Sequence, residues 1–423
     1  MNRAVAAGDL ERAVAEVSRE LDTSPDALPD TLTGDKPLLL LERGTLRYAA
    51  QEHERSSADL ETADKHLELL DLTDDTAGDI GRFLFSDDSK VYVAPPFEKL
   101  MLSTLNLINY LTRGDLEGAR VETRRLRITQ QAVAASHGEV AARTGIGSYV
   151  AGFALEHSGE ADEALRCYDE ALGVRPFPSL AVPASGLARR TAWRGEHVAK
   201  VLAEAPPPDE SGDLLVVVGL GRVPHKEAMR VPIGLALTWA AAVTGSHAMT
   251  PEAQAQAASL AARGLVTWVM FPTLEPTPTR FDTVALGVGG APVELELAAD
   301  LGEEAVASFD AMRGLLIGSA ITRTVTRVLA GLAAEEGAKA GGSKNGLALL
   351  LGLAVQGGLA AADTPDTRSW VTLPRAFFVG RTRVPAGPTR VELRASGDGA
   401  LTLSRDVNVP AGGFRVVALT VLQ

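Results

Sequence analysis

A short helix-start pattern recurs in the first half of the chain and constrains the fold more than any other feature. It reads Gly8-Asp9-Leu10-Glu11-Arg12-Ala13, and related stretches begin at Ala58, Gly114 and Gly159. In each copy a small residue allows a tight turn, and acidic residues follow in the first helical turn, where the helix dipole favours them. An alanine five residues after the small residue lets a preceding helix approach closely. The pattern therefore predicts a series of helical hairpins.

The fourth copy matches the tetratricopeptide pattern most completely. Gly159 makes the turn, and Ala164 and Tyr168 share one face of the helix that follows. The four copies are spaced unevenly and more widely than the ~34 residues of a tetratricopeptide repeat. We therefore expect a degenerate, tetratricopeptide-like α-solenoid over residues 1–203, interrupted by a small β-hairpin near residues 83–93.

The second half of the chain has a different character. Residues 204–213 are rich in proline and acidic residues and predict a rigid linker. Beyond it, eight short segments, from 214–218 to 416–420, show the apolar alternation and the Pro/Gly turns of strands. They predict an antiparallel β-sandwich over residues 214–423, with an inserted Ala/Gly-rich helical pair at residues 302–362. The fold class expected is α+β, multidomain.

The inserted helical pair leaves three interpretations open. Residues 346–362 carry no charge, and as a helix they would span about 26 Å, slightly less than the ~30 Å hydrocarbon core of a bilayer. The helix before them has small residues at Gly314 and Gly318, a spacing suited to close helix contact, but also Arg313 and Arg323, which are awkward in lipid. Burial against the sandwich or a partner protein, a homo-oligomer contact and membrane contact all fit this pattern.

Composition and motifs exclude several classes of function. The net charge of −13 argues against nucleic acid as a partner. The single cysteine, Cys167, excludes an internal disulfide and a cysteine-based zinc site. The seven histidines form no pair at helical ligand spacing, and Gly219-Leu220-Gly221 has Pro224 where a dinucleotide-binding turn needs its third glycine. We expect no catalytic, cofactor-binding or metal-binding residues, and no enzyme.

The first residues lack the apolar stretch of a secretory signal. This pattern is consistent with a cytoplasmic protein or with a chain that begins after a removed signal.

Four landmarks carry a resemblance to a known family. They are the Ser-Asp-Asp turn before Tyr92, the helix start at residues 96–101, the stretch 105–120, and the sequence DTRSWVTLP at residues 366–374. Together they resemble an uncharacterised bacterial envelope family, often lipoproteins, with a tetratricopeptide-like N-terminal half and a β-rich C-terminal half carrying a DTRSWxTLP signature. The resemblance covers residues 35–423. It implies a location in the periplasm or at the outer-membrane periphery, and it implies no activity. The cytoplasm is the alternative location, because the first residues show no signal.

The signature also has a direct physical interpretation. Asp366 and Thr367 can turn the chain after the apolar helix, while Arg368 can pair with a carboxylate and Trp370 can cover the sandwich core. Pro374 ends the motif. We expect a clasp between the helical insertion and the sheet. A binding site built on Arg368 and Trp370 is the alternative.

These observations favour a non-enzymatic protein–protein interaction scaffold of the cell envelope, because helical repeats expose a concave surface that suits a protein partner. The expected contacts are exposed residues near the hairpin and a cationic stripe on the following helix: Tyr92, Phe97, Glu98, Lys99, Arg120, Arg124 and Arg125. One alternative is a membrane-associating or oligomerising component that uses residues 314–362. Another is a cell-wall or peptide-acting enzyme whose site has no recognised motif.

Overall fold

The computed structural model describes residues 1–73, 92, 94–202, 211–242, 254–255, 257–259, 268–340 and 365–423. Within these residues the protein combines helices with antiparallel and mixed sheets, so its fold is α+β. Three expected features lie outside the described residues: the hairpin near 83–93, apart from Tyr92, the linker residues 204–210, and the apolar segment 346–362.

Helices dominate the first half. They are α1 (Asn2–Ala6), α2 (Leu10–Glu20), α3 (Lys36–Ala49), α4 (His53–Thr73), α6 (Pro96–Thr112), α7 (Leu116–His137), α8 (Gly145–His157), α9 (Ala161–Val174), η3 (Pro178–Leu180), α10 (Ala181–Ala188) and α11 (Val198–Val201). Helices α3 and α4, α6 and α7, and α8 and α9 pack as consecutive pairs.

The turns that begin three of the helices follow the recurring pattern. Gly8, Gly114 and Gly159 adopt left-handed backbone with φ of 76°, 75° and 82°, a conformation that favours glycine. After the first two, the side chains of Asp9 and Asp115 accept hydrogen bonds from main-chain N–H groups at 3.0 and 2.9 Å and cap α2 and α7.

The second copy of the pattern does not mark a helix start, and this expectation is wrong. Ala58 lies in the interior of α4, which begins at His53. The turn before α4 is made by Gln51, a non-glycine residue at φ 68°. A glutamine there gives no signal of a left-handed turn in the sequence.

Strands and helices together form the described part of the second half. They are β1 (Gly212–Leu220), β2 (His225–Pro232), α12 (Ile233–Ala242), β3 (Trp268–Glu275), β4 (Phe281–Val288), β5 (Ala291–Val293), β6 (Glu296–Asp300), α14 (Leu301–Ala340), β7 (Ala376–Val384), β8 (Gly387–Gly397), β9 (Gly399–Val409) and β10 (Phe414–Val421). Strands β10-β1-β7-β6 form the first sheet, β5-β4-β8-β9 form the second sheet, and β2 pairs with β3.

The expectation of purely antiparallel strands is wrong for the first sheet. Strand β1 pairs with β7 in the antiparallel direction but with β10 in parallel, from Asp213 beside Phe414 to Leu220 beside Val421. The first strand of this half therefore lies beside the last strand of the chain, a pairing that no local turn signal encodes.

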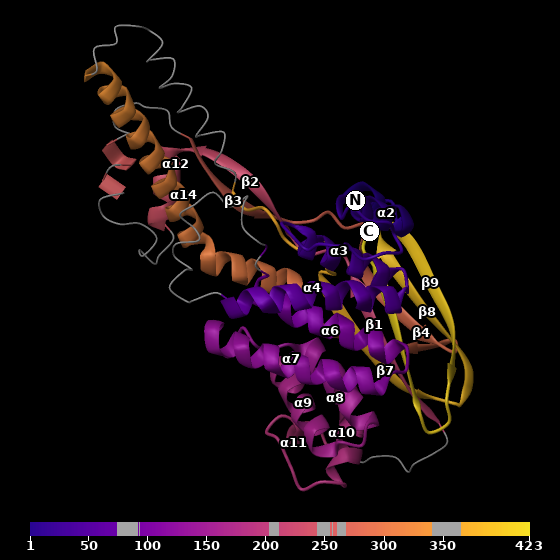
Figure 1. The fold of residues 1–423 in the computed structure, drawn as a ribbon. Helices are drawn as coiled ribbons and strands as arrows, with labels where there is room; N and C mark the ends of the chain where they lie inside the picture. The colour runs from indigo at the N-terminus through magenta and orange to yellow at the C-terminus, as the bar shows by residue number, and fades with distance from the viewer. Residues whose placement is uncertain are drawn as a thin grey trace.

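The helices, the first sheet and the second sheet form three layers (Figure 1). Side chains alternate across β1: Leu215 and Val217 pack with the helices, while Leu214 and Val216 pack with the second sheet. Burial on both faces explains why β1 is an unbroken apolar run. The two halves of the chain thus share one hydrophobic core.

Helices α3, α6 and α8 form the inner face of the helix layer. Helices α3 and α6 contact β10, and α8 contacts β6 and β7. The inner face is therefore covered by the first sheet of the same chain.

An arm formed by β2, β3, α12 and α14 extends away from the three layers (Figure 1). It has a small apolar cluster of its own, which includes Val231, Phe271 and Ile321. Strand β2 and helix α12 were not expected from the sequence.

Candidate functional site

The signature residues 366–374 lie against the helix layer. The carboxylate of Glu42, on α3, accepts hydrogen bonds from the main-chain N–H groups of Val371 at 2.7 Å and Thr372 at 2.9 Å. Arg368 donates to Asp366 at 2.9 Å and to Asp35 at 2.8 Å, so it does pair with carboxylates. Pro374, at the end of the signature, is buried. The clasp therefore joins the helix layer to the first sheet, whereas we expected it between the insertion and the sheet.

Trp370 is the centre of this contact. Its side chain is fully buried among the helices, and its indole N–H donates to Oγ1 of Thr45 at 2.9 Å. Its main-chain N–H donates to Glu98 at 3.3 Å, and the hydroxyl of Tyr92 donates to the same carboxylate. Trp370 thus contributes to the core shared with the helices and not, as expected, to the core between the two sheets.

Three of the expected partner contacts are buried, and their expected exposure is wrong. Tyr92, Phe97 and Glu98 are 2%, 9% and 2% exposed, and Glu98 accepts hydrogen bonds from Tyr92 and from the main-chain N–H of Trp370. Lys99 is half-buried. Tyr92 and Glu98 thus contribute to the contact between the two halves of the chain.

Burial dominates the ionisation of the two carboxyls in the clasp. Desolvation raises the pKa of Glu42 to about 7, although the N–H groups of Val371 and Thr372 oppose this shift. Desolvation likewise raises the pKa of Glu98 to about 7, against the hydrogen bond from Tyr92.

The expected cationic stripe on α7 is largely neutralised by neighbouring carboxylates. Arg120 pairs with Glu117 at 3.1 Å and also with Glu160. Arg125 pairs with Asp64 at 3.0 Å and with Glu122 at 3.4 Å. Arg124 is exposed. An acidic peptide would therefore compete with carboxylates already in place.

A second polar contact joins the halves at Arg381 of β7. Its guanidinium donates to Asp213 at 3.1 Å and to Glu156 at 2.9 Å. Burial favours the neutral acid at Asp213, but Arg381 and His157 hold the pKa of Asp213 well below its ordinary value.

Glu156, His157 and Asp213 could supply metal ligands by distance alone, because their ligand atoms lie within 4.8 Å of one another. However, the guanidinium of Arg381 already binds two of the three side chains. The guanidinium compensates the negative charge of the two carboxylates, as a bound metal ion would. We therefore interpret the group as a structural ion cluster.

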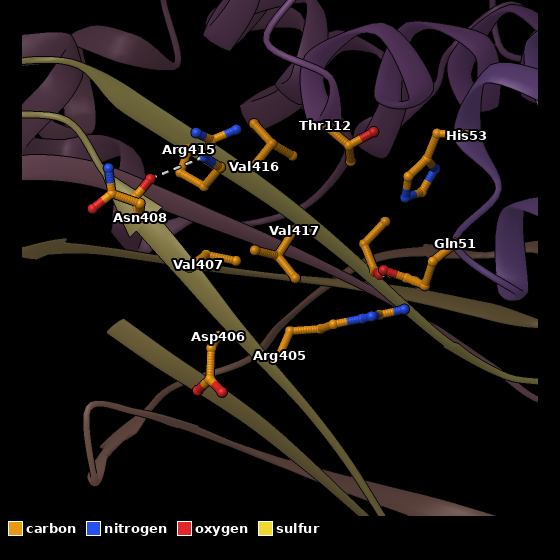
Figure 2. Close-up of a pocket in the computed structure, with 11 residues that line it drawn as sticks. Gln51, His53, Thr112, Arg405, Asp406, Val407, Asn408, Arg415, Val416 and Val417 are labelled. Atoms are coloured by element: carbon orange, nitrogen blue, oxygen red, sulfur yellow. Dashed lines mark hydrogen bonds between the residues drawn. The ribbon is translucent and has the colours of Figure 1, made fainter. Parts of the chain in front are cut away.

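A cavity of about 420 Å³ opens where the helix layer meets the free edges of the two sheets (Figure 2). We call it the inter-layer cavity. The helix layer, β9 and β10 supply its walls: Gln51, His53, Thr112, Arg405, Asp406, Val407, Asn408, Arg415, Val416, Val417 and Ala418. Its size falls within the range of about 300–1,000 Å³ that is usual for ligand sites.

Hydrogen bonds fix the imidazole of His53 in this wall. Ser56 donates to the carbonyl of Gly44, and the amide nitrogen of Asn109 donates to Ser56 at 2.9 Å. The amide oxygen of Asn109 therefore faces Nδ1 of His53, at 2.8 Å, and accepts a hydrogen bond from its N–H. Burial lowers the pKa of His53, and Arg113 and Arg405 lower it further. With Nδ1 donating to Asn109, Nε2 is the acceptor of the neutral form of the ring.

Sequence reasoning missed the cavity because its residues come from distant parts of the chain. One signal was present on β9. The residues at alternate positions, Leu401, Leu403, Val407 and Val409, are apolar, and Arg405 interrupts that row. Arg405 itself is exposed at this edge strand, where the row borders the cavity.

Comparisons with protein-family models, with curated proteins and with solved structures found no match.

Proposed function

We propose that this protein is a non-enzymatic protein–protein interaction scaffold whose partner docks at the inter-layer cavity. The observation that carries the proposal is the burial of the inner helix face. Because the first sheet and Trp370 cover the face that helical repeats commonly use, a partner needs another surface. The inter-layer cavity is polar, open and lined by all three layers.

The finer fold belongs to this proposal. We infer a tetratricopeptide-like α-solenoid for the helix layer, supported by consecutive helix pairs and by left-handed glycines before α2, α7 and α9. We infer a β-sandwich for the two sheets, supported by the apolar cluster between them. The inferred solenoid and sandwich share one hydrophobic core, and a shared core would hold the residues of the cavity wall in fixed positions for a partner.

The contacts of the buried carboxyls support a role without catalysis. Glu42 and Glu98 have pKa values near 7, as a general acid or base would require. Each accepts hydrogen bonds from main-chain N–H groups of the signature residues. A substrate would have to displace the chain's own backbone to reach them.

The sequence resemblance supports a place for this scaffold at the bacterial cell envelope, in the periplasm or at the outer-membrane periphery. Fractionation of the native cells, followed by detection of the full-length protein, tests this location. Recovery in the cytoplasm alone would contradict it.

Affinity capture with charge-reversal variants tests the docking site. The wild-type protein, Arg405→Glu and Arg390→Glu serve as baits, and each captured protein is identified, purified and assayed for direct binding. Arg390 is the matched control, since it lies on β8 opposite Asp406 and makes a hydrogen bond to Ser404 away from the cavity. We expect Arg405→Glu to weaken partner binding at least about 10-fold, or about 1.4 kcal/mol, and Arg390→Glu to leave it unchanged. Equal binding to all three baits would contradict docking at the cavity.

A second candidate function, membrane association through the arm, is favoured by one observation. Among the described residues, Leu301–Val325 of α14 is long and apolar enough to cross a membrane, and only 33% of the apolar stretch is buried. Leu235, Trp268 and Met312 add exposed apolar surface to the arm. Such surface is typical of membrane or protein contacts.

Liposome flotation separates this candidate from the scaffold. The intact chain and a variant lacking residues 343–362 are floated with vesicles that contain anionic lipid. Flotation of both proteins would favour membrane association through α14, and flotation of the intact chain alone would assign it to residues 343–362. If neither floats, the arm contacts protein or a second copy of the chain, and light scattering at several concentrations identifies self-association.

A further inference from the structure

Arg405 lies in a position that the fold otherwise gives to apolar side chains. It pairs across β8 and β9 with Val391, which is fully buried between the two sheets. Because paired residues point to the same face of a sheet, Arg405 points inward, as Leu403 and Val407 do. Its neighbour Asp406 pairs with Arg390 and points away from the cavity (Figure 2).

Arg405 is exposed at the edge of the second sheet, and its side chain lies on the cavity side of β9 (Figure 2). Among the residues that the structure describes, Arg405 forms no ion pair, and the only acidic residue in the cavity wall is Asp406. Arg415, also in the wall, uses its Nε to donate to the carbonyl of Asn408 at 3.2 Å. The cavity therefore has an excess of positive charge.

The opposite wall contains the strained Gln51. The corresponding turns at Gly8, Gly114 and Gly159 use glycine, whereas Gln51 holds left-handed backbone at φ 68°. Its side-chain amide donates to the carbonyl of Ala418 on β10. A non-glycine residue in this conformation costs about 1 kcal/mol or more, and such strain gathers at functional sites. Here it places a hydrogen-bonding side chain in the cavity wall.

Nε2 of His53 is a second polar group in the same wall as Gln51. In the described part of the chain it has no hydrogen-bond partner, while Nδ1 is held by Asn109. The ring packs edge-on against Tyr48, and the charges of Arg113 and Arg405 both lower its pKa. A proton added to Nε2 would therefore place a further positive charge close to Arg405.

We propose that the inter-layer cavity binds an oxyanion, a carboxylate or phosphate group, which pairs with Arg405 and is hydrogen-bonded by the protonated ring of His53. This inference rests on the proposed function and specifies its chemistry, since the anion is the group by which a partner enters the cavity. A free small anion has the same chemistry, and the experiment separates the two sources.

The test measures the pKa of His53 by NMR in the full chain labelled with ¹³C in its histidines. Sodium phosphate, sodium succinate and a short polyglutamate peptide are the probes, at constant ionic strength. An anion that binds the protonated ring raises its pKa, and a rise of about one unit corresponds to ~10-fold tighter binding to that form. His157, which lies beside Asp213, is the internal control and should not respond.

Two variants make the result specific. Arg405→Gln should abolish the anion-dependent rise, and Arg390→Gln, the matched control on the outer face, should retain it. Circular dichroism confirms that both variants are folded. A rise with phosphate or succinate supports the inference with a free anion as the source, and a rise with polyglutamate alone supports it with an acidic partner segment.

The inference is overturned if no probe moves His53, or if Arg390→Gln removes the rise as completely as Arg405→Gln does. Its failure is distinguishable from that of the proposed function. Captured partners that bind the wild-type protein but not Arg405→Glu would support docking at the cavity. If, in the same protein, no anion changes the pKa of His53, the docking proposal is supported and the oxyanion inference is wrong.

Discussion

At the scale of single residues, Glu42 and Glu98 join the two halves of the chain through hydrogen bonds from main-chain N–H groups. The segment they hold, Trp370 to Thr372, lies on the helices as a bound peptide would. Both carboxyls are buried, so the folded protein holds their protons more tightly than the unfolded chain does. The stability of the clasp should therefore depend on pH.

The pH prediction follows from the sign of these shifts. The pKa of each carboxyl rises from 4.5 to about 7 on folding, so the stabilisation is fully present below about pH 4.5 and is lost as the pH rises through about 7. We expect urea denaturation to give a lower free energy of unfolding at pH 8 than at pH 5. The double variant Glu42→Gln, Glu98→Gln should reduce this difference by about 1–3 kcal/mol.

Glu117→Gln is the control for the pH experiment, since Glu117 is 85% exposed. It should leave the dependence on pH unchanged. Glu122 and Glu304 also have pKa values raised to about 7, so part of the slope should persist in the double variant. A double variant with the full wild-type slope would show that the clasp carboxyls do not titrate in this range.

Trp370 carries the second residue-scale prediction. Its side chain is fully buried, so Trp370→Ala should lower the free energy of unfolding by about 3–5 kcal/mol, through lost burial and the cavity left behind. Urea denaturation measures the change. Trp268→Ala is the matched control, because Trp268 is 43% exposed. Its effect should stay within about 1 kcal/mol, and equal losses in both variants would contradict the clasp.

The sequence indicated the residues of the clasp but not their partners. The charge of Arg368 predicted a carboxylate nearby, and Asp35 and Asp366 supply it. The role of Glu42 could not be predicted, because the sequence of an amphipathic helix does not distinguish a buried glutamate from an exposed one. The residues of the inter-layer cavity likewise meet only after folding.

At the scale of elements, close approach between paired helices depends on small residues. A Cβ atom on Gly152 of α8 would lie 2.5 Å from the ring of Tyr168 and 3.2 Å from the carbonyl of Ala164, both on α9. Tyr168 is fully buried and cannot move aside easily. The spacing of these three residues in the fourth repeat copy therefore reflects a real contact.

We predict that Gly152→Ala lowers the free energy of unfolding by about 1–3 kcal/mol, because the added methyl group overpacks this contact. Gly186→Ala on α10 is the control, since a Cβ there meets nothing within 4 Å. It should be neutral or stabilise the protein by up to about 1 kcal/mol, as alanine favours helix. Chemical denaturation compares the two, and a neutral Gly152→Ala would argue against the tight pairing.

Local patterns predicted elements well where glycine, proline and helix caps mark the turns. They were wrong at Ala58, because Gln51 makes the turn that glycine makes elsewhere. They also missed β2, whose exposed and half-buried residues, such as Lys226 and Glu227, show little apolar alternation.

At the scale of the whole molecule, the halves that the sequence separates near residue 204 share one core. The helices and the first sheet bury their apolar side chains together, and Trp370 and Arg381 link them further. The shared core could not be predicted from the sequence. The apolar run of β1 indicates that both faces of the strand are buried, but not which elements cover each face.

A shared core predicts cooperative unfolding. In urea, hydrogen exchange measured by mass spectrometry should show peptides from α6 and β1 losing protection at the same midpoint. Peptides from β2, in the arm with its separate cluster, serve as the comparison and should lose protection at lower urea. Separate midpoints for α6 and β1 would mean two independent domains.

The parallel pairing of β10 with β1 has a consequence for synthesis on the ribosome. Helices α3 and α6 emerge long before residues 414–421, the strand that they contact. Until that strand arrives, nascent chains display uncovered apolar helix faces, which are a natural substrate for chaperones. The helix layer can therefore close on β10 only after residues 414–421 have been synthesised.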